Sequence, residues 1–297
     1  MKNYIDLHMH SYYSDDGEYT PEQLVTFCHQ RGIDIMAITD HNSVSASDEE
    51  VQFCKEMGIL TIPGVEIDCA WKGIDFHVVG YGIDYHHDDF KALEEHITKQ
   101  EVVCSRKRVE LTNQLGFSLT ERDLEEFTLS DIWSGELFAE LLLSMPEYQD
   151  HEVLKPYREG GSRSDNPLVN FYWDFYAQGK PCYLEINFPT LEETLDLIHR
   201  HGGVAVLAHP GINLKDRFAL FPEMVKLGLD GVEAFSSYHT PETAAYFYDQ
   251  AKTHDIMVTC GSDFHGKTKP SIHIGDSGCE INQHEIEEKL RQYGLIA

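Results

Sequence analysis

The chain has 297 residues, of which 41% are hydrophobic and 25% are charged. This composition is typical of a globular protein and excludes collagen-like, disordered and disulfide-rich miniprotein classes. No run of about 18 or more apolar residues is present, so we expect neither a membrane span nor a membrane partner.

The chain is strongly acidic, with 23 Lys and Arg against 51 Asp and Glu and a formal net charge of −28. Basic side chains supply most non-specific affinity for nucleic acids, so we expect no binding of long nucleic acids. A small anionic substrate could bind only where the negative electrostatic potential of the protein is reversed locally, and bound metal ions would provide that reversal.

The seven cysteines are scattered, and none are spaced as CxxC. Most lie in apolar runs, so we interpret them as buried free thiols of a reducing cytoplasm. A strand-like pattern begins at Tyr4 and leaves no room for a signal peptide, which also favours a cytoplasmic protein.

Short apolar runs alternate with amphipathic helical patterns over most of the chain. The strand-like runs are residues 4–8, 33–39, 60–65, 77–81, 204–208, 231–235 and 257–260. Thr20 and Thr190 are predicted to cap two of the intervening helices. This alternation predicts an α/β fold of parallel strands with right-handed crossovers.

The middle of the chain differs, because residues 86–180 are mostly helical in pattern, with a long helix expected over 89–115 and a short one over 136–143. We interpret this segment as an insertion between two parts of one α/β domain, residues 1–85 and 181–297. The basic run Arg106–Arg108 is expected on a solvated helical face, and the aromatic run 171–176 in packing between the insertion and the α/β domain.

Histidines and carboxylates follow or open the predicted strands, in the segments Asp6–His10, Asp40–His41, Val65–Glu66, Phe76–His77, Ala208–His209 and Asp263–His265. The carboxyl ends of parallel strands share one face, where active sites of such folds lie. In a strand, side chains two residues apart point the same way, so His8 and His10 can chelate one cation.

The donor set contains nitrogen and oxygen atoms and no sulfur, which suits Zn, Mn or Fe(II). It is too large for one tetrahedral site and predicts two or three ions, bridged most plausibly by Glu66. Taken alone, His77 is an ordinary core histidine and Glu66 an ordinary loop carboxylate. Burying the whole set without compensation would be costly, and this favours the metal cluster.

These motifs resemble the polymerase-and-histidinol-phosphatase (PHP) superfamily. The resemblance covers about residues 1–85 and 181–275, through Asp6–Ser11, Ser14–Asp15, Thr39–Asn42, Pro63–Glu66, Ala208–Pro210 and Ser262–His265. It implies a distorted seven-stranded (β/α) barrel of TIM type, a site for three divalent metal ions (Mn, Zn or Fe) and phosphoesterase activity.

The family pattern implies a ligand set for each metal. The first metal would be held by His8, His10, Glu66 and Asp263, the second by Glu66, His77 and His209, and the third by Asp15, His41 and His265. Asp16 competes with Asp15, which we prefer because it follows Ser14 at the commoner spacing. Asp40 would accept a hydrogen bond from a ligand imidazole, or would merely cap the next turn.

A phosphoester also needs a proton donor for the leaving group and donors for the phosphate. His239, which follows a predicted strand, is the candidate general acid, or else a surface-loop histidine. The Gly-rich loop 160–167 predicts that Arg163 and Ser164 bind the phosphate. Lys180, at the point where the chain returns from the insertion to the barrel, is a further candidate for binding the substrate. In resembling relatives an insertion likewise brings Arg and Ser to the substrate phosphate.

We therefore expect a metal-dependent phosphoric ester hydrolase that cleaves a small phosphorylated metabolite through a metal-bridging hydroxide, with a cyclic sugar phosphate favoured. The alternatives are a nucleoside 3′,5′-bisphosphate phosphatase and a 5′-3′ exonuclease of short oligonucleotides. A rival of another class is an amidohydrolase acting on a C–N bond, which normally has a lysine where this chain has His77. A non-catalytic metal scaffold is a further rival.

Overall fold

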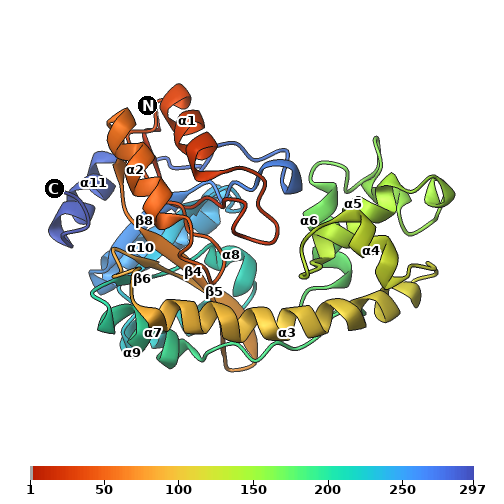
Figure 1. The fold of residues 1–297 in the computed structure, drawn as a ribbon. Coiled ribbons are helices and arrows are strands. Elements are labelled where there is room, and N and C mark those ends of the chain that lie inside the picture. Colours follow the sequence, from red (N-terminus) through yellow and green to blue (C-terminus); the bar gives the residue numbers. More distant parts are fainter. Residues whose placement is uncertain (1–2) are drawn as a thin grey trace.

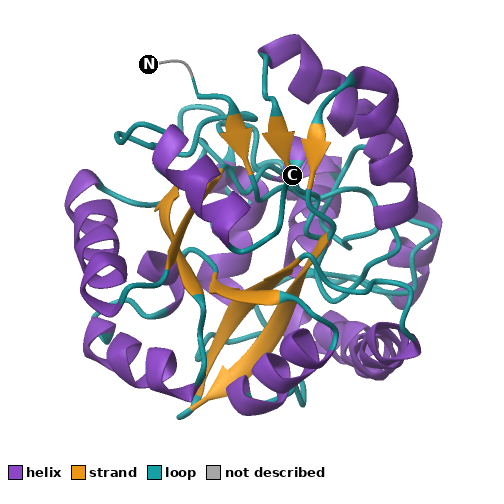
Figure 2. Cartoon of the chain, turned by 90° about the vertical axis from the view of Figure 1, so that its left-hand side faces the viewer, coloured by secondary structure: helices purple, strands orange, loops and turns teal. Residues whose placement is uncertain are grey.

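The computed structural model describes residues 3–297, which form two sheets surrounded by helices (Figures 1 and 2). The strands are β1 (Ile5–Asp6), β2 (Ile35–Met36), β3 (Leu60–Thr61), β4 (Gly64–Trp71), β5 (Ile74–Tyr81), β6 (Val204–Leu207), β7 (Gly231–Ser236) and β8 (Met257–Gly261). The α/β class predicted from the alternating pattern is confirmed.

The longer helices are α1 (Pro21–Arg31), α2 (Ser47–Met57), α3 (Asp88–Asn113), α4 (Glu121–Phe127), α5 (Gly135–Ser144), α6 (Pro167–Phe175), α7 (Leu191–Arg200), α9 (Phe221–Leu227), α10 (Pro241–His254) and α11 (His284–Gln292). Single turns complete the chain: α8 (Pro210–Asn213), η1 (Pro146–Tyr148), η2 (Lys155–Tyr157), η3 (Phe218–Leu220) and η4 (Gly266–Thr268). The expected caps form, since Thr20 accepts from Gln23 N and Thr190 from Glu193 N.

The first sheet has the order β1-β2-β3 and is parallel, and the second has the order β4-β5-β6-β7-β8. The expectation of parallel strands fails at β5, which pairs antiparallel with both β4 and β6. The reason is the tight turn at Lys72 and Gly73, whose φ angles of 50° and 71° suit a two-residue hairpin.

The two sheets are joined by isolated contacts. Leu7 N donates to Cys260 O at 3.0 Å, beside β8, and a single bridge links His41 to Glu66. Among residues 3–297 the strands do not form one closed sheet. These contacts nevertheless bring the chain that follows β1 and β2 alongside β8 and β4.

Helices α3 to α6 extend to one side, with the long α3 running beneath the gap between the two parts in Figure 1. They have their own apolar cluster, built around the buried side chains of Trp133, Phe138 and Phe171. The aromatic run of α6 thus packs mainly within the insertion. The division at residues 86 and 180 stays a prediction, which this separate cluster supports.

All seven cysteines are free thiols and six of them are buried, as expected. In the described part of the chain, no helix combines the length and apolarity needed to cross a membrane.

Candidate metal centre

The predicted ligands come together at one end of the two sheets. His8 and His10 follow β1, His41 follows β2, Glu66 lies on β4 and His77 on β5. His209 follows β6, and Asp263 and His265 follow β8. Four of the ligand candidates have no solvent-exposed surface: His8, His10, Glu66 and His265. This part of the centre is therefore closed to bulk solvent.

One group of possible ligands consists of His8, His10, Glu66 and Asp263, whose ligand atoms all lie within 4.8 Å of one another. Glu66 Oε2 is 3.1 Å from His8 Nε2 and 3.2 Å from His10 Nε2. Asp263 Oδ1 is 3.1 Å from His10 Nε2. These are the four residues that the family resemblance implies for the first metal.

The other oxygen of Glu66 faces a second set of imidazoles. Glu66 Oε1 lies 3.0 Å from His77 Nδ1 and 2.9 Å from His209 Nε2. His41, Glu66 and His77 form a further possible ligand group. Because its two oxygens face different histidines, Glu66 has the geometry of a bridging carboxylate.

A third group contains His10, Asp16, His41 and His265. Asp16 Oδ2 is 3.2 Å from His265 Nε2, whereas the side chain of Asp15 is exposed and belongs to none of the groups. The structure therefore favours Asp16 over Asp15 as the carboxylate of this group. The turn that begins at Ser11, closed by Ser14 N to Ser11 O and Gly17 N to Ser14 O, points the second aspartate inward.

The fit to metal ions can be tested on buried atoms that lack hydrogen-bond partners. Seven such atoms lie in the centre: His8 Nε2, His10 Nε2, Asp16 Oδ1, His41 Nδ1, Glu66 Oε2, Asp68 Oδ1 and Asp263 Oδ1. Buried polar atoms are normally satisfied, and leaving so many without partners is costly. The donor set therefore fits hard or borderline divalent cations.

Three of the ligand histidines are held in the tautomer that leaves Nε2 free for a metal. Nδ1 of His8 contacts Glu233 Oε2 at 2.7 Å, that of His209 contacts Asn213 Oδ1 at 2.7 Å, and that of His265 contacts Asp263 O at 2.8 Å. Each partner is an acceptor, so the proton resides on Nδ1 and the Nε2 lone pair faces the centre.

Electrostatics favour an ionised Glu66 and a neutral His10. At His8, His41 and His209 burial is outweighed by the nearby carboxylates, Glu66 first, which raise the pKa of each imidazole. Burial alone would raise the pKa of Glu66, but the imidazoles of His8, His77 and His41 hold it well below its ordinary value. Burial, together with His265 and His41, lowers the pKa of His10 to about 4. Near neutral pH, Glu66 is thus anionic and His10 offers a lone pair.

The backbone is strained where ligands leave the strands. Asp263 has a φ of 57° and His209 a φ of 23°, a region that L-residues other than glycine rarely adopt. Such conformations cost about 1–3 kcal/mol each and concentrate at functional sites. Gly261 permits a close approach, since a Cβ there would lie 2.2 Å from His8 Cβ.

Asp40 does not contact a ligand imidazole directly, which corrects the expectation. Its carboxylate accepts hydrogen bonds from Ser11 N, Ser11 Oγ and Ser14 Oγ at 2.6, 2.6 and 3.0 Å. Ser14 Oγ in turn lies 3.0 Å from His10 Nδ1 and accepts from His41 N at 3.0 Å. Asp40 therefore orients His10 through Ser14, and is a positioning residue.

His239 is bound to backbone on both sides of its ring, which contradicts a role as general acid. Its Nδ1 donates to Ala234 O at 2.8 Å, and its Nε2 accepts from Gly211 N at 3.0 Å. Burial lowers the pKa of His239, which keeps the ring neutral. The side chain has no free proton to transfer and instead fixes the turn that follows His209.

The predicted phosphate-binding residues of the insertion are not brought to the centre. Arg163 forms a two-point ion pair with Asp174, with Nε–Oδ2 and Nη2–Oδ1 distances of 3.0 Å each. Ser164 Oγ donates to Gly161 O within its own turn, and Lys180 is exposed. These contacts of Arg163 and Ser164 are internal to the insertion, while Asn166 of the same loop accepts a hydrogen bond from Ser271 N, in the loop after β8, at 3.0 Å.

Several residues of the centre escaped sequence reasoning. Asp68 Oδ1 is 3.2 Å from His77 Nε2, and the Glu-x-Asp spacing on β4 was a signal for it. Glu233, which contacts His8, and Lys269, which contacts Asp263, carried no such signal.

The basic run of α3 differs from its prediction. Arg108, which was expected on a solvated helical face, is largely buried and donates to Glu101 Oε2 at 2.7 Å.

A separate group, His87, Asp89 and His201, lies at the start of α3. Arg200 Nη1 is already 3.2 Å from Asp89 Oδ2, and His87 Nδ1 accepts from Asp89 N. Its donors thus have protein partners, unlike those of the main centre.

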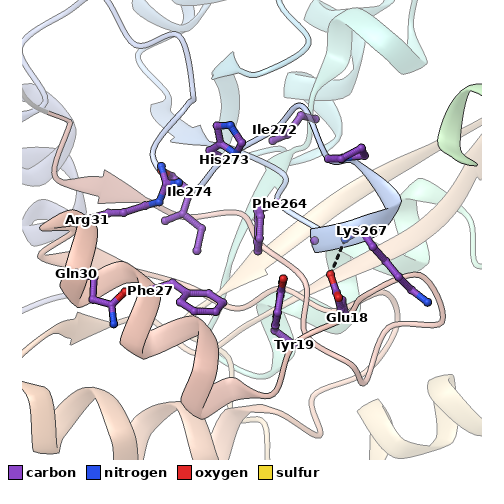
Figure 3. Close-up of a pocket in the computed structure, with 12 residues that line it drawn as sticks. Glu18, Tyr19, Phe27, Gln30, Arg31, Phe264, Lys267, Ile272, His273 and Ile274 are labelled. Atoms are coloured by element: carbon purple, nitrogen blue, oxygen red, sulfur yellow. Dashed lines mark hydrogen bonds between the residues drawn. The ribbon is translucent and has the colours of Figure 1, made fainter. Parts of the chain in front are cut away.

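A pocket of about 510 Å³ lies behind the centre, between α1 and the loop after β8 (Figure 3). Tyr19, Phe27 and Phe264 line it, and the dashed contact in Figure 3 joins Lys267 N to Glu18. None of the metal-ligand candidates lines this pocket.

Comparison with known proteins decides the family. Residues 6–163 match the model of the PHP domain. The chain belongs to the PHP domain family. The resemblance seen in the motifs is confirmed, and with it the class of metal-dependent phosphoesterases.

Three curated PHP relatives match nearly the whole chain. The 5′-3′ exoribonuclease Rnm of Escherichia coli (strain K12) is 30% identical over 91% of this chain and 87% of its own length. The phosphoribosyl 1,2-cyclic phosphate 1,2-diphosphodiesterase of Eggerthella lenta is 27% identical over 91% and 97%. The 3′,5′-nucleoside bisphosphate phosphatase of Chromobacterium violaceum is 28% identical over 96% and 97%.

Proposed function

We propose that this PHP protein is a trinuclear metal phosphoesterase that hydrolyses a small phosphorylated metabolite, with a cyclic sugar phosphate as its substrate. The observation that carries the proposal is the set of seven buried, unpartnered ligand atoms in one centre. In this proposal the eight strands of the two sheets correspond to the distorted seven-stranded barrel expected of the family, although, within the described residues, they do not close into one sheet.

The three overlapping ligand groups support three metal positions. His8, His10, Glu66 and Asp263 would hold the first metal, Glu66, His77 and His209 the second, and Asp16, His41 and His265 the third. Asp68 lies 3.4 Å from His41 Nδ1 and 3.2 Å from His77 Nε2, so it is available between the second and third positions. Bound divalent ions supply a nucleophile at neutral pH and stabilise charge on phosphoryl oxygens.

The protein's own contribution is orientation. Glu233, Asn213 and the Asp263 carbonyl fix the ring protons of His8, His209 and His265. Ser14 does the same for His10, with its hydroxyl donating to Asp40 and accepting from His41 N. A preorganised ligand shell of this kind holds the reacting groups in place without reorganisation.

Charge supports the cyclic phosphate over the bisphosphate. A cyclic phosphodiester group carries one negative charge, whereas each phosphomonoester of a bisphosphate carries about −1.5 to −2 at neutral pH. The chain has a net charge of −28, and the side chain that was expected to bind the substrate phosphate, Arg163, is paired with Asp174. The same acidity disfavours long nucleic acids.

The test compares hydrolysis by the Mn-loaded protein of a five-membered cyclic ribose phosphate, a nucleoside 3′,5′-bisphosphate and a short oligoribonucleotide. Ring opening to the phosphomonoester, release of inorganic phosphate and release of mononucleotides are followed, respectively. We expect the highest kcat/KM for the cyclic substrate. Faster hydrolysis of the bisphosphate or the oligonucleotide would reassign the substrate within the same chemistry. Turnover of an amide or a lactone without hydrolysis of any of the three phosphoesters would refute the phosphoesterase.

A further inference from the structure

A buried lysine lies against the metal-ligand groups. Lys269 follows η4, and its side chain is 8% exposed. Its Nζ donates to Asp263 Oδ2 at 2.7 Å and lies 3.4 Å from His265 Nε2. The ring of Tyr238 is 5.3 Å away and adds a cation–π contact.

Lys269 is distinguished by its position among the basic residues. Between residues 3 and 297, no other Lys or Arg forms an ion pair with a member of the three ligand groups. A lysine is rarely buried, because its ammonium loses hydration, and it is retained only where other groups stabilise its charge. Asp263 accepts only one of the three ammonium protons of Lys269.

The contacts of Lys269 are compatible with bound metals. Asp263 uses Oδ2 for Lys269, while its Oδ1 faces His8 and His10. His265 Nε2 belongs to a ligand group, so a metal would occupy its lone pair. Within residues 3–297, Nζ makes no other hydrogen bond, so two ammonium protons are then left without an acceptor.

We propose that Lys269 binds the phosphoryl group of the substrate, in the role that the sequence assigned to Arg163 and Lys180. This inference rests on the proposed phosphoesterase function. The ammonium offers a point charge and free donors to a phosphate oxygen, and its bond to Asp263 fixes it beside the ligands.

The test uses Lys269→Met and Lys269→Gln, with Lys267→Met as the matched control. Lys267 lies two residues away on the same turn, is exposed and pairs with Glu140 at 2.6 Å. Metal content is measured by mass spectrometry, and the Kd of inorganic phosphate for the Mn-loaded protein by calorimetry. We expect at least about tenfold weaker phosphate binding in both Lys269 variants, unchanged metal content, and a wild-type Kd for Lys267→Met.

Phosphate binding within twofold of wild type in either folded Lys269 variant would overturn the proposal. Loss of metal from both variants would also overturn it, since Lys269 would then act only by holding Asp263. Neither result depends on turnover. A failure of the proposed function would appear separately, as wild-type protein that binds metal but hydrolyses no phosphoester.

Discussion

Glu233 Oε2 accepts a 2.7 Å hydrogen bond from Nδ1 of His8, whose Nε2 faces the metal-ligand centre. Partners of this kind fix the tautomer of a ligand and raise its basicity. Glu233→Ala should therefore weaken metal binding by about 10- to 100-fold, measured by titration of the metal-free protein. The exposed Glu125→Ala serves as control, and equal affinities in the two variants would remove Glu233 from this role.

The two neighbouring aspartates give a direct test of the third ligand group. Asp16→Asn should lower the ratio of metal to protein, because Asp16 Oδ2 lies 3.2 Å from His265 Nε2. Asp15→Asn should keep the full ratio, because Asp15 is exposed and belongs to none of the ligand groups. Elemental analysis after dialysis against Mn²⁺ measures both, and the reverse pattern would restore Asp15 as the ligand.

Metal binding should stabilise the fold, because it satisfies the seven unpartnered atoms only in the folded state. At a free Mn²⁺ concentration of about 100 times Kd, linkage predicts roughly 2.7 kcal/mol and a rise in Tm of about 5 °C or more. Calorimetry with and without EDTA measures the shift. An unchanged Tm in protein shown to bind the metal would contradict this account of the centre.

Glu50 gives a pH dependence remote from the metal ligands. It is fully buried, and burial raises its pKa to about 8. A raised carboxyl pKa stabilises the fold below the unfolded value of about 4.3, and this contribution is lost as pH rises toward 8. Glu50→Gln should therefore raise Tm more at pH 8 than at pH 5, whereas the exposed Glu56→Gln should show no such trend.

The ion pair of Arg163 with Asp174 predicts a structural role for both residues. Arg163→Ala and Asp174→Ala should each change KM for the preferred phosphoester by less than about twofold. Because both side chains are about one-third exposed, the loss of stability should stay within about 1 kcal/mol. A large rise in KM for Arg163→Ala alone would return Arg163 to the phosphate site.

The ligands that the sequence predicted well are those whose geometry is local. His8 and His10 alternate along one extended segment, and Asp263 and His265 repeat the spacing, so a period of two suffices to place them on one face. The choice between Asp15 and Asp16 could not be made from the sequence, because a one-residue step in a turn changes the direction of the side chain. That direction depends on hydrogen bonds between Ser11, Ser14 and Gly17.

Residues that depend on remote partners were beyond sequence reasoning. Arg163 resembles a phosphate-binding arginine until Asp174, eleven residues later, is seen to occupy its guanidinium. His239 resembles a free histidine until Gly211 and Ala234 are found on either side of it. The antiparallel direction of β5 was not predicted, because the sequence pattern of a strand does not indicate whether its neighbours run parallel or antiparallel to it.

The β4–β5 hairpin places Glu66, Asp68 and His77 within twelve consecutive positions of the chain, joined by one tight turn. Pairing between such close segments closes only a short loop, and so forms quickly compared with contacts that span the whole chain. Two of the three ligands of the second set, Glu66 and His77, can thus come together while the ribosome is still making the insertion. His209 and Asp263 complete the centre only after the last strands emerge.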